Sequence, residues 1–363
     1  MLRQMTHELL EQESSAARVR QLADSADGWD RRTWSQLSEL GLLGVAIPEQ
    51  YAGQGLGAVE QALVLEEMGR AALPSPYFAT AVLASSALLA CGNDGLKQRY
   101  LPEIAAGRLI ATLAWTEEPL SWAASDVRLA AHPDGERWVL NGTKWLVPWA
   151  HAADLILVVA RTDDGPTLFV VDRAATGLDI TPLPTFDITN RVSRIDFRDV
   201  DAQPVGEPGG AEKILEQVLT HAALGASAEM LGAARKCLGM AVEYAKTREQ
   251  FGQPIGTFQA IKHRCADRLV DVEEAHAATY YAAWALSTRA PGADLAVSVA
   301  KAFVSDAARR VCSDSIQVHG GIGFTWDYDL HLYFKRAKHM EPLYGDATFH
   351  RERALRLAIA AHD

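Results

Sequence analysis

The spacing of apolar residues changes twice along the chain, and this change limits the possible folds more than any other feature. Up to about residue 112, apolar residues recur every three or four positions, as in Ala62, Leu65, Met68 and Ala72. This spacing is typical of amphipathic helices. Shorter runs with strand character follow to about residue 205, and helical spacing then returns to the end of the chain. The pattern therefore predicts helices, then strands, then helices.

The central region is expected to form a small antiparallel barrel or sandwich. Its candidate strands are Trp138–Trp145, Leu155–Arg161, Leu168–Asp172 and Ser193–Phe197. Two turn dipeptides, Asn141-Gly142 and Asp164-Gly165, are expected to join strands. Strands do not alternate with helices, and no Gly-x-Gly-x-x-Gly follows a strand, which argues against a Rossmann domain. The expected α+β multi-domain fold has a helical domain at 1–112, an antiparallel β-domain at 113–208 and a helical domain at 209–363.

Composition narrows the class of protein. The 363 residues are 48% hydrophobic and 22% charged, which is enough to bury two or three connected cores. A net charge of −11 argues against nucleic-acid binding through a generally basic surface, but leaves room for a local pocket for a phosphorylated ligand. Neither a secretion signal nor an apolar run of about 20 residues is found, so we expect a cytoplasmic protein without membrane insertion. The four cysteines lack metal or disulfide spacing, so no metal site is expected.

Two segments carry groups suited to a pyrophosphate. The first is Arg248-Glu-Gln-Phe-Gly-Gln-Pro-Ile-Gly-Thr-Phe-Gln259, and the second is Gln317-Val-His-Gly-Gly-Ile-Gly-Phe324. A guanidinium group binds phosphate oxygens well, and paired glycines let a backbone approach closely. Arg248 alone could complement a helix C-terminus, and the glycines alone could form a turn. Their joint occurrence after the β-region favours a cofactor site.

Together with Leu42-Leu-Gly-Val-Ala-Ile-Pro-Glu49 and Leu65-Glu-Glu-Met-Gly-Arg70, these segments resemble the acyl-CoA dehydrogenase family over essentially the whole chain. The resemblance implies an N-terminal helical domain, a central β-barrel and a C-terminal four-helix bundle, assembled as a dimer of dimers with FAD between subunits. It assigns Trp115 and Thr116 to the flavin ring and Ser125 to the ring or the pyrophosphate. It also implies that a further group reaches the neighbouring subunit's FAD: Arg248, Phe251, Gln259, Gln317, Gly320 and Gly321.

The catalytic base is where the chain departs from this family. Family members remove the α-proton of an acyl-CoA with a glutamate, and Tyr344 stands at that position here. A phenol with a reference pKa near 10 is a poor substitute for a carboxylate. Glu229 and Asp346 are the candidate replacements, and Glu341 is a weaker one. Each of the first two has a structural alternative: a buried ion pair for Glu229 and a helix N-cap for Asp346.

Other departures concern the flavin and CoA. Leu146 and Pro148 stand where the family often has a tryptophan and a threonine beside the flavin, and Ala223 stands where many members keep a CoA-fixing arginine. The chain is similar to a bacterial branch whose sterol side-chain acyl-CoA dehydrogenases pair two unlike subunits.

The leading expectation is FAD-dependent α,β-dehydrogenation of an acyl-CoA, by this chain alone or in a heteromer, with an electron-transfer flavoprotein as acceptor. The alternatives are a flavin oxidase or monooxygenase on the same fold, and a non-catalytic subunit that completes another chain's FAD site.

Overall fold

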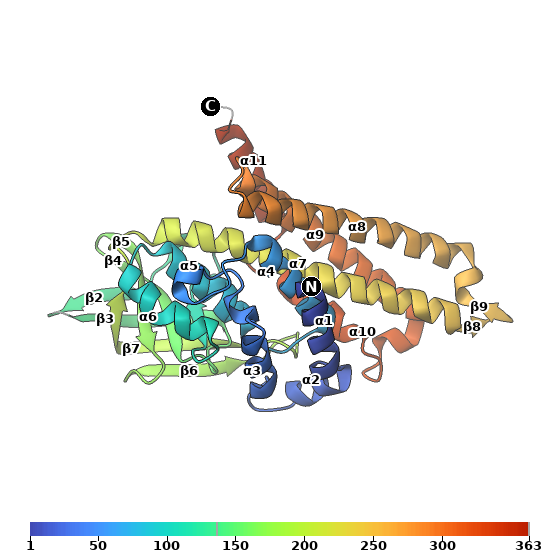
Figure 1. The fold of residues 1–363 in the computed structure, drawn as a ribbon, viewed down its shortest axis with the longest axis horizontal. Helices are drawn as coiled ribbons and strands as arrows, with labels where there is room; N and C mark the ends of the chain where they lie inside the picture. The colour runs from blue at the N-terminus through green and yellow to red at the C-terminus, as the bar shows by residue number, and fades with distance from the viewer. Residues whose placement is uncertain (136, 362–363) are drawn as a thin grey trace.

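The computed structural model describes residues 1–135 and 137–361, and its regions follow one another as helices, strands and helices (Figure 1). The N-terminal region is helical. Its elements are α1 (Leu2–Glu13), α2 (Ala16–Ala23), α3 (Arg31–Glu39), α4 (Ala58–Ala71), a π-helix (Phe78–Ala84), α5 (Ser85–Ala90) and α6 (Asp94–Ala105). Side chains of Ser15, Asp30 and Asn93 accept backbone N–H groups at the starts of α2, α3 and α6. These caps satisfy donors that have no partner within the helix.

The central region is a seven-stranded sheet that closes on itself. Its strands are β1 (Ala111–Ala114), β2 (Ala130–Asp134), β3 (Arg137–Pro148), β4 (Leu155–Thr162), β5 (Gly165–Asp172), β6 (Leu178–Leu183) and β7 (Val192–Pro204). The order β1-β4-β2-β3-β7-β5 is closed by pairing of β4 with β5, and β6 pairs with β7. Most pairs are antiparallel, as expected, but β1 and β2 each pair with β4 in parallel.

One of the two predicted turns is found and the other is not. Gly165 begins β5 and pairs with Thr162, so Asp164-Gly165 joins β4 to β5 as predicted. Asn141-Gly142 instead lies inside β3, where the register with β7 shifts. Gly142 has φ +139° there, and the Asn141 side chain exchanges hydrogen bonds with Asp199 of β7. The dipeptide forms a bulge and not a hairpin turn. Both structures favour a glycine with positive φ, so the same dipeptide is compatible with either.

The C-terminal region is a bundle of long helices. It comprises α7 (Ala211–Thr247), α8 (Gln259–Ser287), α9 (Ala293–His319), α10 (Leu330–Met340) and α11 (Ala347–Ala360). A two-stranded hairpin, β8 (Glu249–Gln250) and β9 (Gln253–Pro254), joins α7 to α8. Figure 1 shows this hairpin at the opposite end of the molecule from the seven-stranded sheet. In the described residues, no helix is both long enough and apolar enough to cross a membrane.

Two glycines set the distance between α4 and α7. A Cβ atom added at Gly69 would lie 2.0 Å from the carbonyl oxygen of Glu229, and one at Gly232 would lie 1.9 Å from that of Glu66. The two backbones therefore touch at reciprocal positions, which only glycine permits. This contact fixes where α7 carries Glu229 relative to the N-terminal helices.

Candidate functional site

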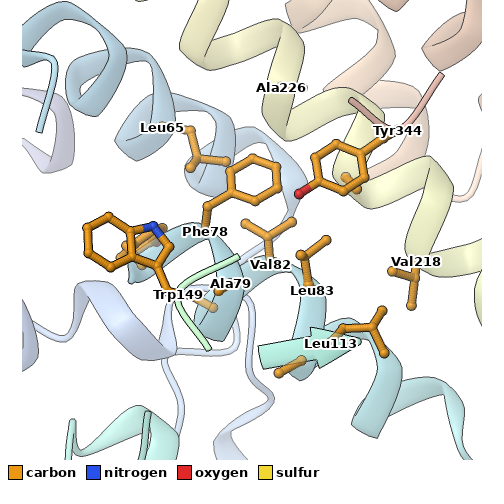
Figure 2. Close-up of a cluster of buried hydrophobic side chains, with 14 of the residues drawn as sticks. Leu65, Phe78, Ala79, Val82, Leu83, Leu113, Trp149, Val218, Ala226 and Tyr344 are labelled. Atoms are coloured by element: carbon orange, nitrogen blue, oxygen red, sulfur yellow. The ribbon is translucent and has the colours of Figure 1, made fainter. Parts of the chain in front are cut away.

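Tyr344 is a core residue in the loop between α10 and α11. It is 5% exposed, and its backbone has φ +58°, a left-handed conformation that is uncommon for a non-glycine residue. Its ring stacks on Phe78 of the π-helix with ring centres 5.4 Å apart, and the ring of Trp122 lies 5.2 Å away. Figure 2 shows the Tyr344 ring beside Phe78, among the aliphatic side chains of Val82 and Leu83. Tyr344 thus fills space between the helices and the sheet.

The space left beside Tyr344 is small. One cavity of about 30 Å³ is bounded by Trp115, Thr116, Trp122, Leu146, Pro148 and Tyr344. A second, also about 30 Å³, is bounded by Tyr344 together with Phe78, Glu229, Arg336 and His339. A single water needs roughly 10–15 Å³ of such volume. Each cavity therefore has room for a few water molecules and no more.

Trp115 and Thr116, which the family resemblance assigned to a flavin ring, border the same cavity as Tyr344. The Thr116 hydroxyl donates to the carbonyl oxygen of Trp145, and the buried ammonium group of Lys144 donates to that of Trp115 at 3.0 Å. The Trp115 indole N–H is buried and has no partner among the described residues. Trp122 packs edge-on against Trp115 with ring centres 5.4 Å apart. The Trp115 ring therefore faces another aromatic side chain of this chain, and the Thr116 hydroxyl is bound to its backbone. Ser125 is exposed in a short turn, Ala124–Asp126.

Glu229 takes part in a buried ion pair, as the structural alternative predicted. Its carboxylate accepts a hydrogen bond from Arg336 at 3.0 Å, and Arg336 also pairs with Asp187 at 3.1 Å. The same guanidinium donates to the carbonyl oxygen of Leu73 and to the hydroxyl of Thr189. Burial raises the pKa of the Glu229 carboxyl, and the Arg336 charge opposes that rise. Glu229 still borders the second cavity, but one of its oxygens is engaged.

Asp346 is the N-cap of α11. Its carboxylate accepts the backbone N–H of Phe349 at 2.8 Å, which is the structural alternative predicted from the sequence. Glu341, the weaker candidate, directs its carboxylate to Lys338 at 2.5 Å. Each of the candidate carboxylates thus has a structural partner.

The other group of predicted cofactor residues lies at the far end of the bundle. Arg248 is the C-cap residue that follows α7, and Phe251 lies in the β8–β9 hairpin with 91% of its surface exposed and φ +55°. Gln259 and Gln317 are exposed at the start of α8 and near the end of α9. A Cβ atom added at Gly320 or Gly321 would meet nothing within 4 Å. We call these residues the hairpin edge: Arg248, Phe251, Gln259, Gln317, Gly320 and Gly321.

Sequence reasoning missed three residues that close the cavities. Phe78 and Trp122 were not singled out because one aromatic residue in an apolar run or a loop carries no periodic signal. His339 borders both cavities and lies three residues after Arg336 on α10, so the two share a helix face. Burial lowers the pKa of His339, which keeps its imidazole neutral.

The two halves of the expected FAD site differ in how well they fit the cofactor. Beside Tyr344, a cavity of about 30 Å³ does not accommodate a flavin ring while Trp122 and Tyr344 keep their positions. At the hairpin edge, an exposed guanidinium and an open glycine pair fit a pyrophosphate presented from outside the chain. Because the sheet and the hairpin lie at opposite ends of the molecule, one chain does not bring both halves to one FAD (Figure 1).

Comparison with known proteins identifies the family. The acyl-CoA dehydrogenase N-terminal domain matches residues 1–108, the middle domain 112–200 and the C-terminal domain 209–358. The chain therefore belongs to the acyl-CoA dehydrogenase family, whose members are flavoprotein oxidoreductases of lipid metabolism and are typically tetramers.

Its relatives include heteromeric enzymes. The acyl-CoA dehydrogenase FadE27 of Mycobacterium tuberculosis is 33% identical, and the match covers 91% of this chain and 88% of the relative. A variant of the Tcur3481–Tcur3483 steroid ACAD is 32% identical with a TM-score of 0.90, covering 100% of this chain and 98% of the other. The ChsE4–ChsE5 complex from Mycobacterium tuberculosis is 31% identical with a TM-score of 0.89, covering 98% and 95%.

Proposed function

We propose that this chain is one subunit of a heteromeric FAD-dependent acyl-CoA dehydrogenase and that it completes the FAD site of an unlike partner chain. The observation that carries the proposal is the cavity of about 30 Å³ at the position expected for the flavin ring, bordered by Trp122 and Tyr344. Because the side chains of Trp122 and Tyr344 fill the expected flavin position of this chain, its proposed part in the reaction is to bind a partner's FAD through the exposed hairpin edge.

The hairpin edge supplies binding groups. Arg248 would donate charge-assisted hydrogen bonds to the pyrophosphate, and Gly320-Gly321 would let main-chain N–H groups approach it. The exposed ring of Phe251 would pack on the cofactor or on the partner chain. FAD, when bound, supplies the acceptor for the hydride removed from the acyl-CoA.

Removal of the α-proton requires a free carboxylate close to the substrate. In this chain Glu229 is paired with Arg336, Asp346 caps α11, and residue 344 is a tyrosine. Burial raises the pKa of Tyr344 far above its usual value, so the phenol stays protonated. We therefore assign the base to the partner chain.

Similarity to the relatives supports a proposal for the substrate class. Similarity to the Tcur3481–Tcur3483 steroid ACAD favours an acyl-CoA whose acyl group carries a steroid ring system. An electron-transfer flavoprotein is the proposed acceptor. The proposed subunit has domains at 1–112, 113–208 and 209–363 and assembles as a dimer of dimers.

Co-expression with a homologous partner that has a glutamate at the position of Tyr344 tests this function. The purified complex should contain one FAD for each pair of chains, and a panel of steroid and straight-chain acyl-CoAs added anaerobically should bleach the flavin. The chain expressed alone should give no bleaching. One tightly bound FAD per chain, reduced by an acyl-CoA without a partner, would overturn the proposal.

Arg248→Ala tests the hairpin edge directly. Loss of a charge-assisted contact to phosphate should cost about 2 kcal/mol, or roughly thirtyfold in the Kd of FAD for the complex. Arg108→Ala is the matched control, because Arg108 is exposed and pairs with Glu103 far from the hairpin. Equal FAD affinity in the two variants would argue against a role for this edge.

A second candidate, a self-sufficient dehydrogenase with Glu229 as base, has one observation in its favour: Glu229 and Tyr344 border the same cavity. Glu229→Gln separates the two functions, because the amide preserves shape but accepts no proton. In a self-sufficient enzyme it should abolish flavin reduction and leave the FAD spectrum intact. In the heteromer it should change reduction by less than about tenfold.

A further inference from the structure

Lys301 of α9 is a fully buried lysine with an unusual set of partners. Its ammonium group donates to the carbonyl oxygens of Glu341 and Gly345, each at 2.8 Å, and to the hydroxyl of Ser305 at 3.2 Å. The two carbonyls stand on either side of Tyr344. A single side chain from a neighbouring helix therefore ties both ends of the segment that carries Tyr344.

None of these partners is a carboxylate. The carboxylate of Glu341 binds Lys338, and that of Asp346 caps α11. Burial lowers the pKa of Lys301 to about 7, and the charges of Glu341 and Asp346 oppose this decrease. Because a buried ammonium group is costly unless it is fully hydrogen-bonded, the loop carbonyls and the lysine hold one another in place.

The tied segment has a backbone that needs support. Tyr344 has φ +58° and Gly345 has φ +96°. A left-handed tyrosine persists only where its surroundings determine the conformation. A second contact acts at the same point, since the Nε2–H of His350 donates to the carbonyl oxygen of Tyr344 at 2.8 Å. Glu341 also follows the last turn of α10, whose carbonyl groups favour a nearby cation.

We infer that Lys301 is a positioning residue that aims the side chain at position 344 into the space between Phe78 and Trp122. It acts through the carbonyls of Glu341 and Gly345 and does not touch the ring itself. The inference rests on the proposed function only where that function explains why the cavity beside Tyr344 is filled. The hydrogen bonds from Lys301 go to backbone carbonyls, so they do not depend on which side chain stands at position 344.

Fluorine NMR of protein labelled with 3-fluorotyrosine tests the inference. The Tyr344 signal is assigned by its loss in Tyr344→Phe, and that of Tyr51, in the N-terminal region, by its loss in Tyr51→Phe. Lys301→Met keeps the length of the side chain and removes the ammonium group. It should shift or broaden the Tyr344 signal and leave that of Tyr51 in place. Lys301→Gln, which keeps an N–H donor, should have a smaller effect.

Val304→Ala is the matched control, because Val304 is fully buried on the same helix and has no contact of this kind with the loop carbonyls. It should lower the melting temperature without moving the Tyr344 signal. An unchanged Tyr344 signal in folded Lys301→Met would overturn the inference, as would a larger change in Lys301→Gln than in Lys301→Met or an equal change in Val304→Ala.

The wild-type protein provides a measurement that does not depend on a folded variant. The titratable groups around Lys301 are the carboxylates of Glu341 and Asp346 and the imidazole of His350, whose pKa is lowered to about 4. The charge of Arg353 contributes to the lowered pKa of His350. The Tyr344 signal should therefore shift with the deprotonation of Lys301, which is followed through its own ¹⁵N-labelled Nζ, and a Tyr344 signal that stays fixed while Lys301 titrates would contradict the inference. No acyl-CoA turnover enters either measurement, so failure here is distinct from failure of the proposed function.

Discussion

Tyr344 has the contacts of a core side chain and not those of a proton acceptor. Its ring is buried and stacks on Phe78 with ring centres 5.4 Å apart. Tyr344→Phe should therefore change the free energy of unfolding by less than about 1 kcal/mol, whereas Tyr344→Ala should cost about 3–5 kcal/mol because it leaves a cavity. Urea denaturation measures both. With a partner present, turnover by Tyr344→Phe should fall by less than about tenfold, and a thousandfold loss would show that the phenol takes part in the chemistry.

His350 should make the protein less stable in acid. Burial lowers its pKa from 6.5 to about 4, and the carbonyl of Tyr344 opposes this decrease by accepting its Nε2–H. Between pH 6.5 and 4 the unfolded chain binds a proton that the folded protein does not bind. The contribution of His350 to the free energy of unfolding is therefore fully present above about pH 6.5. It decreases by on the order of 3 kcal/mol as the pH falls to about 4.

His350→Gln should flatten this part of the stability curve, because glutamine can donate to the same carbonyl and does not titrate. Urea denaturation at about pH 4.5 and 7 measures the change. The same substitution at His132, exposed on β2, is the control. Identical pH dependence in the wild type and in His350→Gln would show that another group is responsible.

For single residues, the sequence predicted where a residue of interest stands better than it predicted which side chains that residue contacts. Tyr344 was placed at the base position, and both structural alternatives, the Glu229 ion pair and the Asp346 cap, are confirmed. Lys301 was missed because a lysine in a helix is usually exposed, and only the fold shows that its neighbours are carbonyl groups. Trp122 was missed for a similar reason, since its contact with Tyr344 joins segments far apart in the sequence.

At the scale of elements, the approach of α4 to α7 depends on Gly69. Gly69→Ala would gain about 1 kcal/mol of helix propensity, but the new Cβ would overlap the carbonyl oxygen of Glu229 at 2.0 Å. Separating two packed backbones should outweigh the gain, with a net loss of about 1–3 kcal/mol. The change is measured by thermal or urea unfolding.

Gly239→Ala is the matched control on α7, because a Cβ at Gly239 meets nothing within 4 Å. It should raise stability by about 0.5–1 kcal/mol. The same sign for both variants would show that propensity, and not the contact between the helices, decides the outcome.

Most helices and strands could be predicted because the spacing of apolar residues that indicates them lies within a short stretch of sequence. The stripe along α7 that includes Leu215, Val218 and Glu229 is buried as its spacing predicted, and the four candidate strands lie in β3, β4, β5 and β7. The bulge at Asn141-Gly142 and the strands β1, β2 and β6 were not predicted. Their pairing depends on distant partners such as Asp199, which no local window contains.

At the scale of the whole molecule, Arg336 joins the three regions of the chain. From α10 it pairs with Glu229 of α7, with Asp187 in the segment between β6 and β7, and with the carbonyl oxygen of Leu73 after α4. Arg336→Met would leave two buried carboxylates without their cation. It should cost about 3–5 kcal/mol of stability, because unpaired buried charge is expensive.

The loss in Arg336→Met should diminish as the pH falls, because protonation of Asp187 and Glu229 removes the uncompensated charge. In the wild type, burial tends to raise the pKa of Asp187, but Arg336 and Thr189 hold it below its usual value. The contribution of this carboxylate to wild-type stability is therefore lost as the pH falls through that lowered pKa. Urea denaturation at about pH 4.5 and 7 compares the wild type with Arg336→Met. A difference in the free energy of unfolding that grows in acid would contradict this account of the Arg336 ion pairs.

The 37 residues of α7 span about 55 Å, from the sheet at its first turn to Arg248 at its end. Glu229, which borders the cavity beside Tyr344, lies 19 residues before Arg248, or about 28 Å along α7, so mutations that fill this cavity do not contact the hairpin edge. In an assembly whose cofactor sites each draw on two chains, a duplicated gene can lose one pocket and still be kept by selection for the surface it lends to its neighbour. Enzymes with unlike subunits can arise from such a fold by loss alone.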